Sequence, residues 1–230
     1  MRRIAGFSLF KASAKTSAAI LKAVMAQLKI IAISGASGSG KSALIKELAA
    51  LLGCGSLHFD DFIDEGTYPA DMAFWLAQGA DVNLIQTPRF TEALQQAKAD
   101  AAQSADGPSY LLLEEPFGRQ RLAIASLIDA VVLLCPPADI CLSRVIQRNL
   151  AACAALKQSA ATEANFNKTL MQIANYLRRY DDYLALIYQA TVAQVARNCD
   201  LQINDIAPIN QIAARVLQWL VLDQQRRALF

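Results

Sequence analysis

Residues 30–45 read Ile-Ile-Ala-Ile-Ser-Gly-Ala-Ser-Gly-Ser-Gly-Lys-Ser-Ala-Leu-Ile, and this stretch decides the fold. It begins with the apolar run Ile30–Ile33, which predicts a buried strand. It ends with residues 42–45, which open a helical pattern. The residues between them, Gly35 to Ser42, match the spacing GxxxxGK[ST] in full. This spacing is a specific signal when it connects a strand to a helix, as it does here.

The glycine-rich loop predicts a binding site for a nucleoside triphosphate. Phosphate oxygens must be met by several backbone N–H groups at once, and glycines let the chain curl around them. Lys41 is expected to reach the β- and γ-phosphates, and the Ser42 hydroxyl is expected to bind Mg²⁺. The helix that follows directs its positive end at the anion. The predicted cofactors are therefore ATP and Mg²⁺, and the predicted binding residues are Gly35, Ala36, Ser37, Gly38, Ser39, Gly40, Lys41 and Ser42.

Short apolar runs alternate with helical patterns along the rest of the chain. The runs expected to form buried strands are Ile30–Ser34, Ser56–Phe59, Tyr110–Leu113, Ala130–Cys135 and Leu201–Ile203. Apolar residues recur at helical spacing in 43–52, 91–102, 120–128, 140–155, 166–195 and 211–224. The alternation predicts an α/β fold, specifically a three-layer P-loop NTPase fold with a mostly parallel five-stranded sheet. The stretch 166–195 is long for one helix, so we expect a bend inside it.

Composition favours small-molecule chemistry in the cytoplasm. The chain is 54% hydrophobic and 18% charged, and its net charge is only +2, with no basic block dense enough to follow a nucleic-acid backbone. No run of about 20 apolar residues is present, so we expect no membrane association. The five scattered cysteines lack CxxC spacing, which argues against a disulfide framework or a structural zinc site. The oligomeric state does not follow from these features.

Residues 1–29 are expected to form a basic N-terminal extension or helix, and residues 30–230 one domain, because no linker or repeat divides them. The extension holds Arg2, Arg3, Lys11, Lys15, Lys22 and Lys29, with no acidic residue before Glu47. Such a stretch is typical of an organelle transit peptide, which would remove the protein from the cytoplasm. A basic surface helix beside the first strand, or a natural start at Met25, explains it equally.

Two acidic clusters follow predicted strands on the same rim as the loop, because the carboxyl ends of parallel strands share one edge of the sheet. The first is Asp60-Asp61, where either carboxylate can accept the proton of a substrate hydroxyl or serve as a turn or capping residue. Asp60 is also a candidate metal ligand. The single histidine, His58, precedes them within the strand and is interpreted as packed or hydrogen-bonded rather than catalytic.

The second cluster is Glu114-Glu115, which ends an apolar strand in the manner of a Walker B element. Glu114 is the predicted site residue, orienting a magnesium-bound water or the substrate hydroxyl, while Glu115 points to the other face of the sheet. Ser42, Asp60 and Glu114 thus form the predicted metal set. Arg119 and Arg121 follow directly, and one of them is expected either to meet a substrate carboxylate or phosphate, or to pair with Glu115 on the surface.

These residues resemble the small-molecule P-loop kinases typified by uridine kinase, nicotinamide riboside kinase and phosphoribulokinase. The resemblance covers most of Ile30 to Asp205 and rests on the loop, on Asp60-Asp61-Phe62 and on Glu114. By similarity, residues 30–230 form a P-loop kinase domain, with Asp60 or Asp61 and Glu114 around the acceptor hydroxyl. Asp81 loosely resembles a further substrate-contacting aspartate of the family. Phe62, Tyr68, Phe74 and Trp75 can wall an acceptor pocket or simply pack in the core.

The family also has a helical lid whose arginines clamp the transferring phosphate, and Arg144 and Arg148 follow the fourth strand at the matching place. They lie about one helical turn apart, so both guanidinium groups can reach one phosphate chain. The family pattern has an acidic residue where Asn149 stands and more arginine beyond it. This departure predicts a weaker lid, or one completed by Arg178 or Arg179.

The sequence therefore predicts an ATP-dependent transferase, a kinase that moves the γ-phosphate to a hydroxyl of a small metabolite, with a nucleoside or sugar-like compound favoured. The predicted catalytic residues are Lys41, Asp60, Asp61, Glu114, Arg144 and Arg148. One alternative is a nucleotide-dependent ATPase or switch, which would need a water-positioning glutamine that we do not find. Another is a degenerate nucleotide-binding sensor, although both acidic clusters are present.

Overall fold

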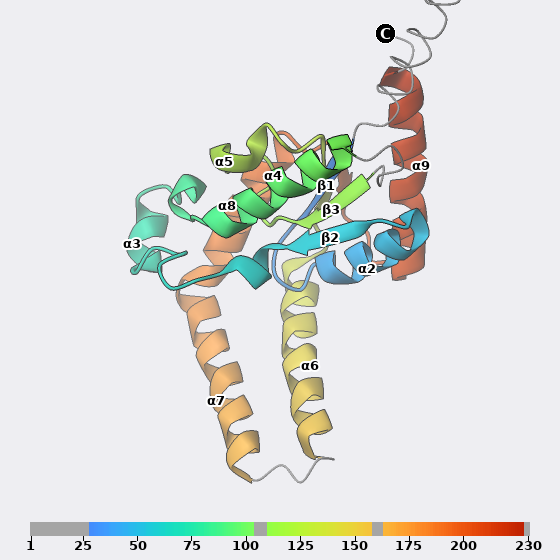
Figure 1. Cartoon of the computed structure of the whole chain (residues 1–230). Coiled ribbons are helices and arrows are strands. Elements are labelled where there is room, and N and C mark those ends of the chain that lie inside the picture. The colour runs from blue at the N-terminus through green and yellow to red at the C-terminus, as the bar shows by residue number, and fades with distance from the viewer. Residues whose placement is uncertain (1–27, 104–109, 158–162, 228–230) are drawn as a thin grey trace, which may run out of the picture.

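The computed structural model describes residues 28–103, 110–157 and 163–227, and its centre is a sheet of parallel strands (Figure 1). The five strands are β1 (Lys29–Ser34), β2 (Gly55–His58), β3 (Tyr110–Glu114), β4 (Ala130–Leu134) and β5 (Leu201–Ile203). They lie in the order β2-β3-β1-β4-β5, and every neighbouring pair is parallel. The predicted α/β fold with a five-stranded parallel sheet is confirmed.

Helices lie between successive strands, and one more follows the last strand. They are α2 (Lys41–Leu52), α3 (Met72–Ala77), α4 (Pro88–Gln103), α5 (Leu122–Ala125), α6 (Ala138–Lys157), α7 (Glu163–Arg179), α8 (Ala185–Ala196) and α9 (Ile209–Arg227). Two 3₁₀ turns, η1 (Phe59–Phe62) and η2 (Val82–Leu84), lie between β2 and α4. A π-helical segment, Tyr180–Leu184, joins α7 to α8. Such a segment is a known cause of helix bending and accounts for the bend expected within 166–195.

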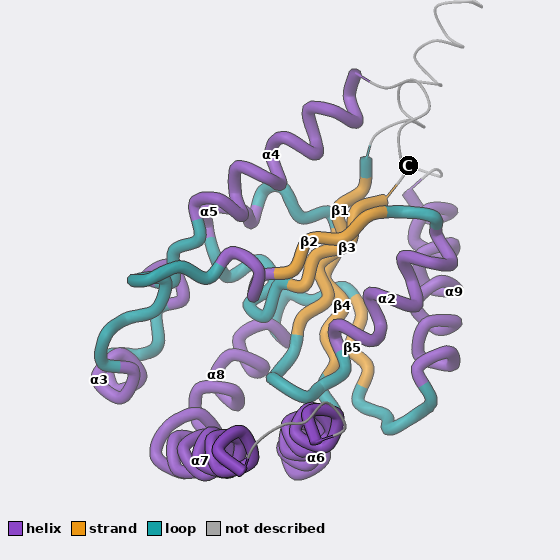
Figure 2. The backbone as a smooth tube through the Cα atoms, turned by 60° about the horizontal axis from the view of Figure 1, so that its bottom comes forward, coloured by secondary structure: helices purple, strands orange, loops and turns teal. Residues whose placement is uncertain are grey.

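The sheet is covered on both faces, which gives three layers (Figure 2). Successive side chains of a strand point to opposite faces, so Ile31 and Ile33 of β1 pack with α2 and α9, while Ile30 and Ala32 pack with α4, α5 and α8. Helices α6 and α7 instead extend away from the sheet (Figure 1). No helix in the described part of the chain is long and apolar enough to cross a bilayer.

The structure differs from the sequence prediction in three elements. The predicted helix 120–128 is wrong in extent: only Leu122–Ala125 is helical, and the chain before it turns through Gly118 at φ +55°. Strand β2 is not buried on both faces, because it lies at the edge of the sheet. Helix α3 was not predicted at all. The segment 1–29 lies almost wholly outside the described residues, which begin at 28, so its assignment as a basic extension or helix stays a prediction.

Candidate active site

A cavity of about 670 Å³ opens at the carboxyl ends of the strands, where parallel α/β sheets place their ligand sites. The glycine-rich loop and the start of α2 form its floor. Its walls come from the segment after β2, from α3, from the chain after β3, and from α6, α7 and α8. The loop predicted to bind phosphate therefore lines an open cavity that is large enough for a ligand.

Two glycines of the loop cannot be replaced without displacing the backbone. At Gly38 the φ angle is +83°, and a Cβ atom there would lie 2.1 Å from the carbonyl oxygen of Cys141 on α6. At Gly35 the φ angle is +141°, and a Cβ atom would lie 2.4 Å from the carbonyl oxygen of Leu134. Glycine freedom thus lets the loop turn tightly and pack against β4 and α6 at once.

Glu114 is the centre of the polar contacts in this cavity. Its Oε2 atom accepts a hydrogen bond of 2.9 Å from Ser42 Oγ and lies 2.9 Å from His58 Nδ1. The second ring nitrogen of His58 is 3.1 Å from Ser56 Oγ. His58 is therefore hydrogen-bonded, as the sequence indicates, but its partner is the predicted site carboxylate. Pattern reasoning missed that pairing because it joins strands distant in sequence.

Lys41 is buried beside the same carboxylate. Its Nζ atom donates to the Ala36 carbonyl at 3.1 Å and lies 3.8 Å from Glu114 Oε1. Burial lowers the pKa of Lys41, while the charges of Glu114 and Asp60 act in the opposite direction. A buried ammonium attracts an anion strongly, because the low dielectric of the site weakens screening, and the neighbouring Glu114 carboxylate offsets part of that attraction.

The two aspartates after β2 are placed differently. Both side chains are exposed, but Asp60 lines the cavity, whereas Asp61 is not among the residues that line it. Burial of its carboxyl raises the pKa of Asp60, and the nearby charge of Glu114 raises it further. Lys41 and Arg148 oppose this shift. A carboxyl with a raised pKa is a stronger proton acceptor, which suits a general base.

Three arginines of α6 and α7 line the cavity: Arg144, Arg148 and Arg179. Arg144 donates weakly to the loop carbonyls of Gly38 and Ser39, at 3.5 and 3.4 Å. Of the two residues predicted to complete the lid, Arg179 lines the cavity, whereas Arg178 bonds Asn175 on its own helix. The arrangement brings several cations to the mouth of the loop.

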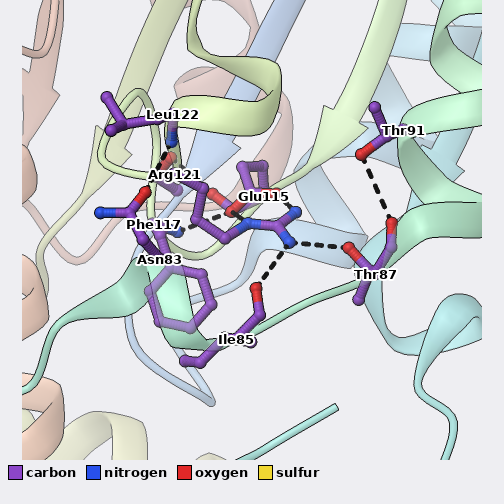
Figure 3. A network of polar contacts seen from close by, with 9 residues as sticks. Asn83, Ile85, Thr87, Thr91, Glu115, Phe117, Arg121 and Leu122 are labelled. Carbon is purple, nitrogen blue, oxygen red and sulfur yellow. Dashed lines mark hydrogen bonds and ion pairs between the residues drawn. The ribbon is translucent and has the colours of Figure 1, made fainter.

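Arg121 does not reach the cavity, because a buried ion pair holds it (Figure 3). Its guanidinium donates to both carboxylate oxygens of Glu115, at 3.2 and 2.6 Å, and to Thr87 Oγ1 at 2.7 Å. The predicted pairing with Glu115 is present, but its surface location is wrong: both side chains are almost fully buried. Burial raises the pKa of Glu115 against the opposing effect of Arg121. Arg119 pairs with Asp200 instead.

Several other predicted residues do not line the cavity. Asp81 caps η2 and accepts hydrogen bonds from Asn83, which also lowers its pKa. The Ser39 hydroxyl is buried without a hydrogen-bond partner. Of the four aromatic residues considered for an acceptor pocket, Tyr68 and Trp75 line the cavity, whereas Phe62 and Phe74 do not.

The sequence analysis missed the contribution of the π segment and α8. Tyr183, Leu184, Ile187, Tyr188 and Thr191 line the cavity from that side. Burial raises the pKa of Tyr188, which keeps its phenol protonated as a hydrogen-bond donor. The spacing of 184, 187, 188 and 191 is the signal that was available, since positions three or four apart share one helix face.

The oxygen atoms of Ser42 and Glu114 fit a magnesium ion better than a softer metal. Mg²⁺ is usually held by one or two protein oxygens together with phosphates and water. In the described residues no group of three or more His, Cys, Asp or Glu side chains is placed to hold a metal by itself. A hydroxyl and a carboxylate beside a phosphate loop match that pattern, and Asp60 shares the same cavity.

No protein-family model and no curated protein matches this chain. Among solved structures it is similar to a shikimate kinase from Acinetobacter baumannii in complex with shikimate, at 19% identity over 88% of this chain and 98% of that chain, with a TM-score of 0.48. It is similar to a sugar kinase from a Janibacter species, at 20% identity over 84% of this chain and 94% of that chain, with a TM-score of 0.44. It is also similar to an uncharacterized protein from Eubacterium ventriosum, at 14% identity over 83% of this chain and 97% of that chain, with a TM-score of 0.44.

Proposed function

We propose that this protein is a magnesium-dependent kinase that transfers the γ-phosphate of ATP to a hydroxyl of a small metabolite, with a nucleoside or sugar-like acceptor favoured. The observation that carries the proposal is the convergence on Glu114: Ser42 and Lys41 of the phosphate loop contact its two oxygens, and Asp60 lines the same cavity. A phosphate loop alone binds nucleotide. A second carboxylate beside it supplies a base for an acceptor.

The chemistry assigns one role to each residue. Asp60 accepts the proton of the acceptor hydroxyl as its oxygen bonds to the γ-phosphorus; the bond to the bridging oxygen breaks and ADP leaves. Lys41, Arg144 and Arg148 offset the charge that moves onto the leaving group. Ser42 and Glu114 would hold magnesium, which when bound neutralises phosphate charge.

Helices α6 and α7 act as the helical lid that the sequence predicts, because both carry arginines that line the cavity. Arg148 and Arg179 line the cavity from different helices, α6 and α7. Movement of the helices toward the loop would bring both guanidinium groups to the phosphates and exclude water from them. The resemblance to the uridine kinase group, a cytoplasmic location and the lack of a nucleic-acid partner are part of the same proposal and stay predictions.

The test incubates the purified full chain with ATP, magnesium and one candidate acceptor at a time. ATP consumption and the mass of the acceptor are both measured. The panel contains nucleosides, nicotinamide riboside, pantothenate and sugar phosphates. One acceptor that gains the mass of a phosphate group supports the kinase. Slow loss of ATP with every acceptor unmodified favours an ATPase or switch, and nucleotide binding without any turnover favours a sensor.

A further inference from the structure

The first half of the phosphate loop lies between two cavities. Besides the active-site cavity, a second cavity of about 380 Å³ is bordered by the end of β4, the start of α6 and helix α8. Ala36, Ser37 and Tyr188 line both cavities, so they form the partition between them. Atoms that border a void have no packing partners on that side. The position of this part of the loop therefore depends on the few contacts that remain.

The residues on either side of Ser37 have backbone partners. The Ala36 carbonyl accepts hydrogen bonds from Ser39 N at 3.2 Å and from Lys41 Nζ at 3.1 Å. The Gly38 backbone packs so closely against the Cys141 carbonyl that a Cβ atom would lie 2.1 Å from it. Ser37 lies between these two contacts, and its hydroxyl interacts with the phenol of Tyr188 on α8.

Tyr188 is itself held by aromatic neighbours. Its ring centroid lies 6.3 Å from that of Tyr180, which in turn lies 6.2 Å from that of Tyr176. These three tyrosines follow one another from α7 through the π segment to α8. Because a tyrosine side chain has only two torsions, a ring fixed in this way presents its hydroxyl at a defined place for little loss of conformational entropy.

We propose that Tyr188 is a positioning residue of the phosphate loop, which holds segment 36–38 in its curled form through the Ser37 hydroxyl before nucleotide binds. Backbone N–H groups can surround phosphate oxygens only while the loop is curled. The apparent affinity for nucleotide therefore falls with the fraction of molecules in which the loop is formed. The inference rests on the nucleotide binding of the proposed function and not on the identity of the acceptor.

A double-mutant cycle on the full-length protein tests the inference. Calorimetry with magnesium and a non-hydrolysable ATP analogue compares the wild type, Tyr188→Phe, Ser37→Ala and the double variant. Each single change should lower the affinity about fivefold, the size of one net hydrogen bond. The double variant should lose no more than a single variant, because both changes remove the same interaction. Losses that multiply in the double variant, or wild-type affinity in Tyr188→Phe, overturn the inference.

Hydrogen exchange of the loop amides gives a second test, which needs no nucleotide. In Tyr188→Phe the amides of residues 36–38 should exchange roughly fivefold faster than in the wild type, because a loop that has lost a contact opens more often. Tyr110→Phe is the matched control: Tyr110 is also half-buried, but it lies at the end of β3 that is far from Glu114. Its loop amides should exchange at the wild-type rate.

Unchanged exchange in Tyr188→Phe, or the same acceleration in both variants, contradicts the inference. The proposed function fails separately, if the wild-type protein does not bind the ATP analogue. The exchange measurement then still decides whether Tyr188 holds the loop.

Discussion

The imidazole of His58 and the carboxylate of Glu114 are hydrogen-bonded across two neighbouring strands, with 2.9 Å between Nδ1 and Oε2. The two residues are direct partners in the register of β2 and β3. The same Oε2 atom accepts from Ser42 at the start of α2. The edge strand therefore fixes the direction of the carboxylate that the phosphate loop uses.

Replacement of His58 should raise the magnesium concentration that nucleotide binding requires. His58→Leu removes one of the two groups that hold Glu114 Oε2, so the magnesium concentration for half-maximal ATP binding should rise about tenfold, the lower end of the range for residues that orient metal ligands. His58→Asn keeps a donor near the position of Nδ1 and should restore most of the affinity. Titrations of ATP binding at several magnesium concentrations measure this effect. Identical curves for the wild type, His58→Leu and His58→Asn would disprove the orienting role of His58.

Loss of Lys41 should weaken ATP binding without unfolding the protein. Lys41→Ala removes the buried ammonium next to Glu114, and affinity for ATP should fall by roughly 10- to 100-fold, the range expected for lost hydrogen bonds to a charged group. Lys46→Ala is the control, because Lys46 is an exposed lysine of the same helix. Calorimetric titration with ATP measures both. Similar affinities for the two variants would remove Lys41 from the phosphate site.

The two aspartates should behave differently. Asp60→Asn should leave ATP binding nearly intact and lower phosphoryl transfer by roughly 10²-fold or more, the usual scale for a lost general base. Asp61→Asn should leave transfer close to the wild-type rate, because Asp61 does not line the cavity. Steady-state rates with the acceptor found above are compared. A large loss in the Asp61 variant with none in the Asp60 variant reverses the assignment.

The pH dependence of transfer should reflect the raised pKa of Asp60. A base must be deprotonated to act, so kcat/KM should reach its maximum above this pKa and fall as the pH decreases through it. Because the shift is upward, the acid limb should lie at a higher pH than the ordinary aspartate value of 3.8. In Asp60→Asn the limb should disappear. A limb that persists unchanged in that variant belongs to another group.

The buried pair of Arg121 and Glu115 should contribute to stability and not to binding. Arg121→Met leaves the Glu115 carboxylate buried without its counterion and should destabilise the fold by about 3–5 kcal/mol. Adding Glu115→Gln should recover part of this loss, because the unpaired charge is removed. Urea unfolding at constant pH gives both values. If Arg121→Met alone were as stable as the wild type, the proposed role of the pair in stability would be contradicted.

The loop and the alternating strand and helix patterns allowed the fold class to be predicted, and the phosphate-binding residues that the loop indicates stay a prediction. Both are local properties: the spacing from Gly35 to Ser42 is complete within one strand, one turn and one helix, and apolar periodicity reports which face of an element is buried. The five strands were placed to within one or two residues for the same reason.

Tertiary structure alone decided which charged residues meet. The sequence could not distinguish Asp60 from Asp61 and could not predict that His58 holds Glu114. It left open whether Arg119 or Arg121 meets a substrate or pairs with Glu115, and it did not indicate that the pair is buried. Side chains from β2, β3 and α2 become neighbours only when the parallel sheet sets its strand order and register. A one-residue change of register would turn each side chain to the opposite face. Sequence therefore determined the kinds of residue available for the site, and the packing of the sheet determined which of them face one another.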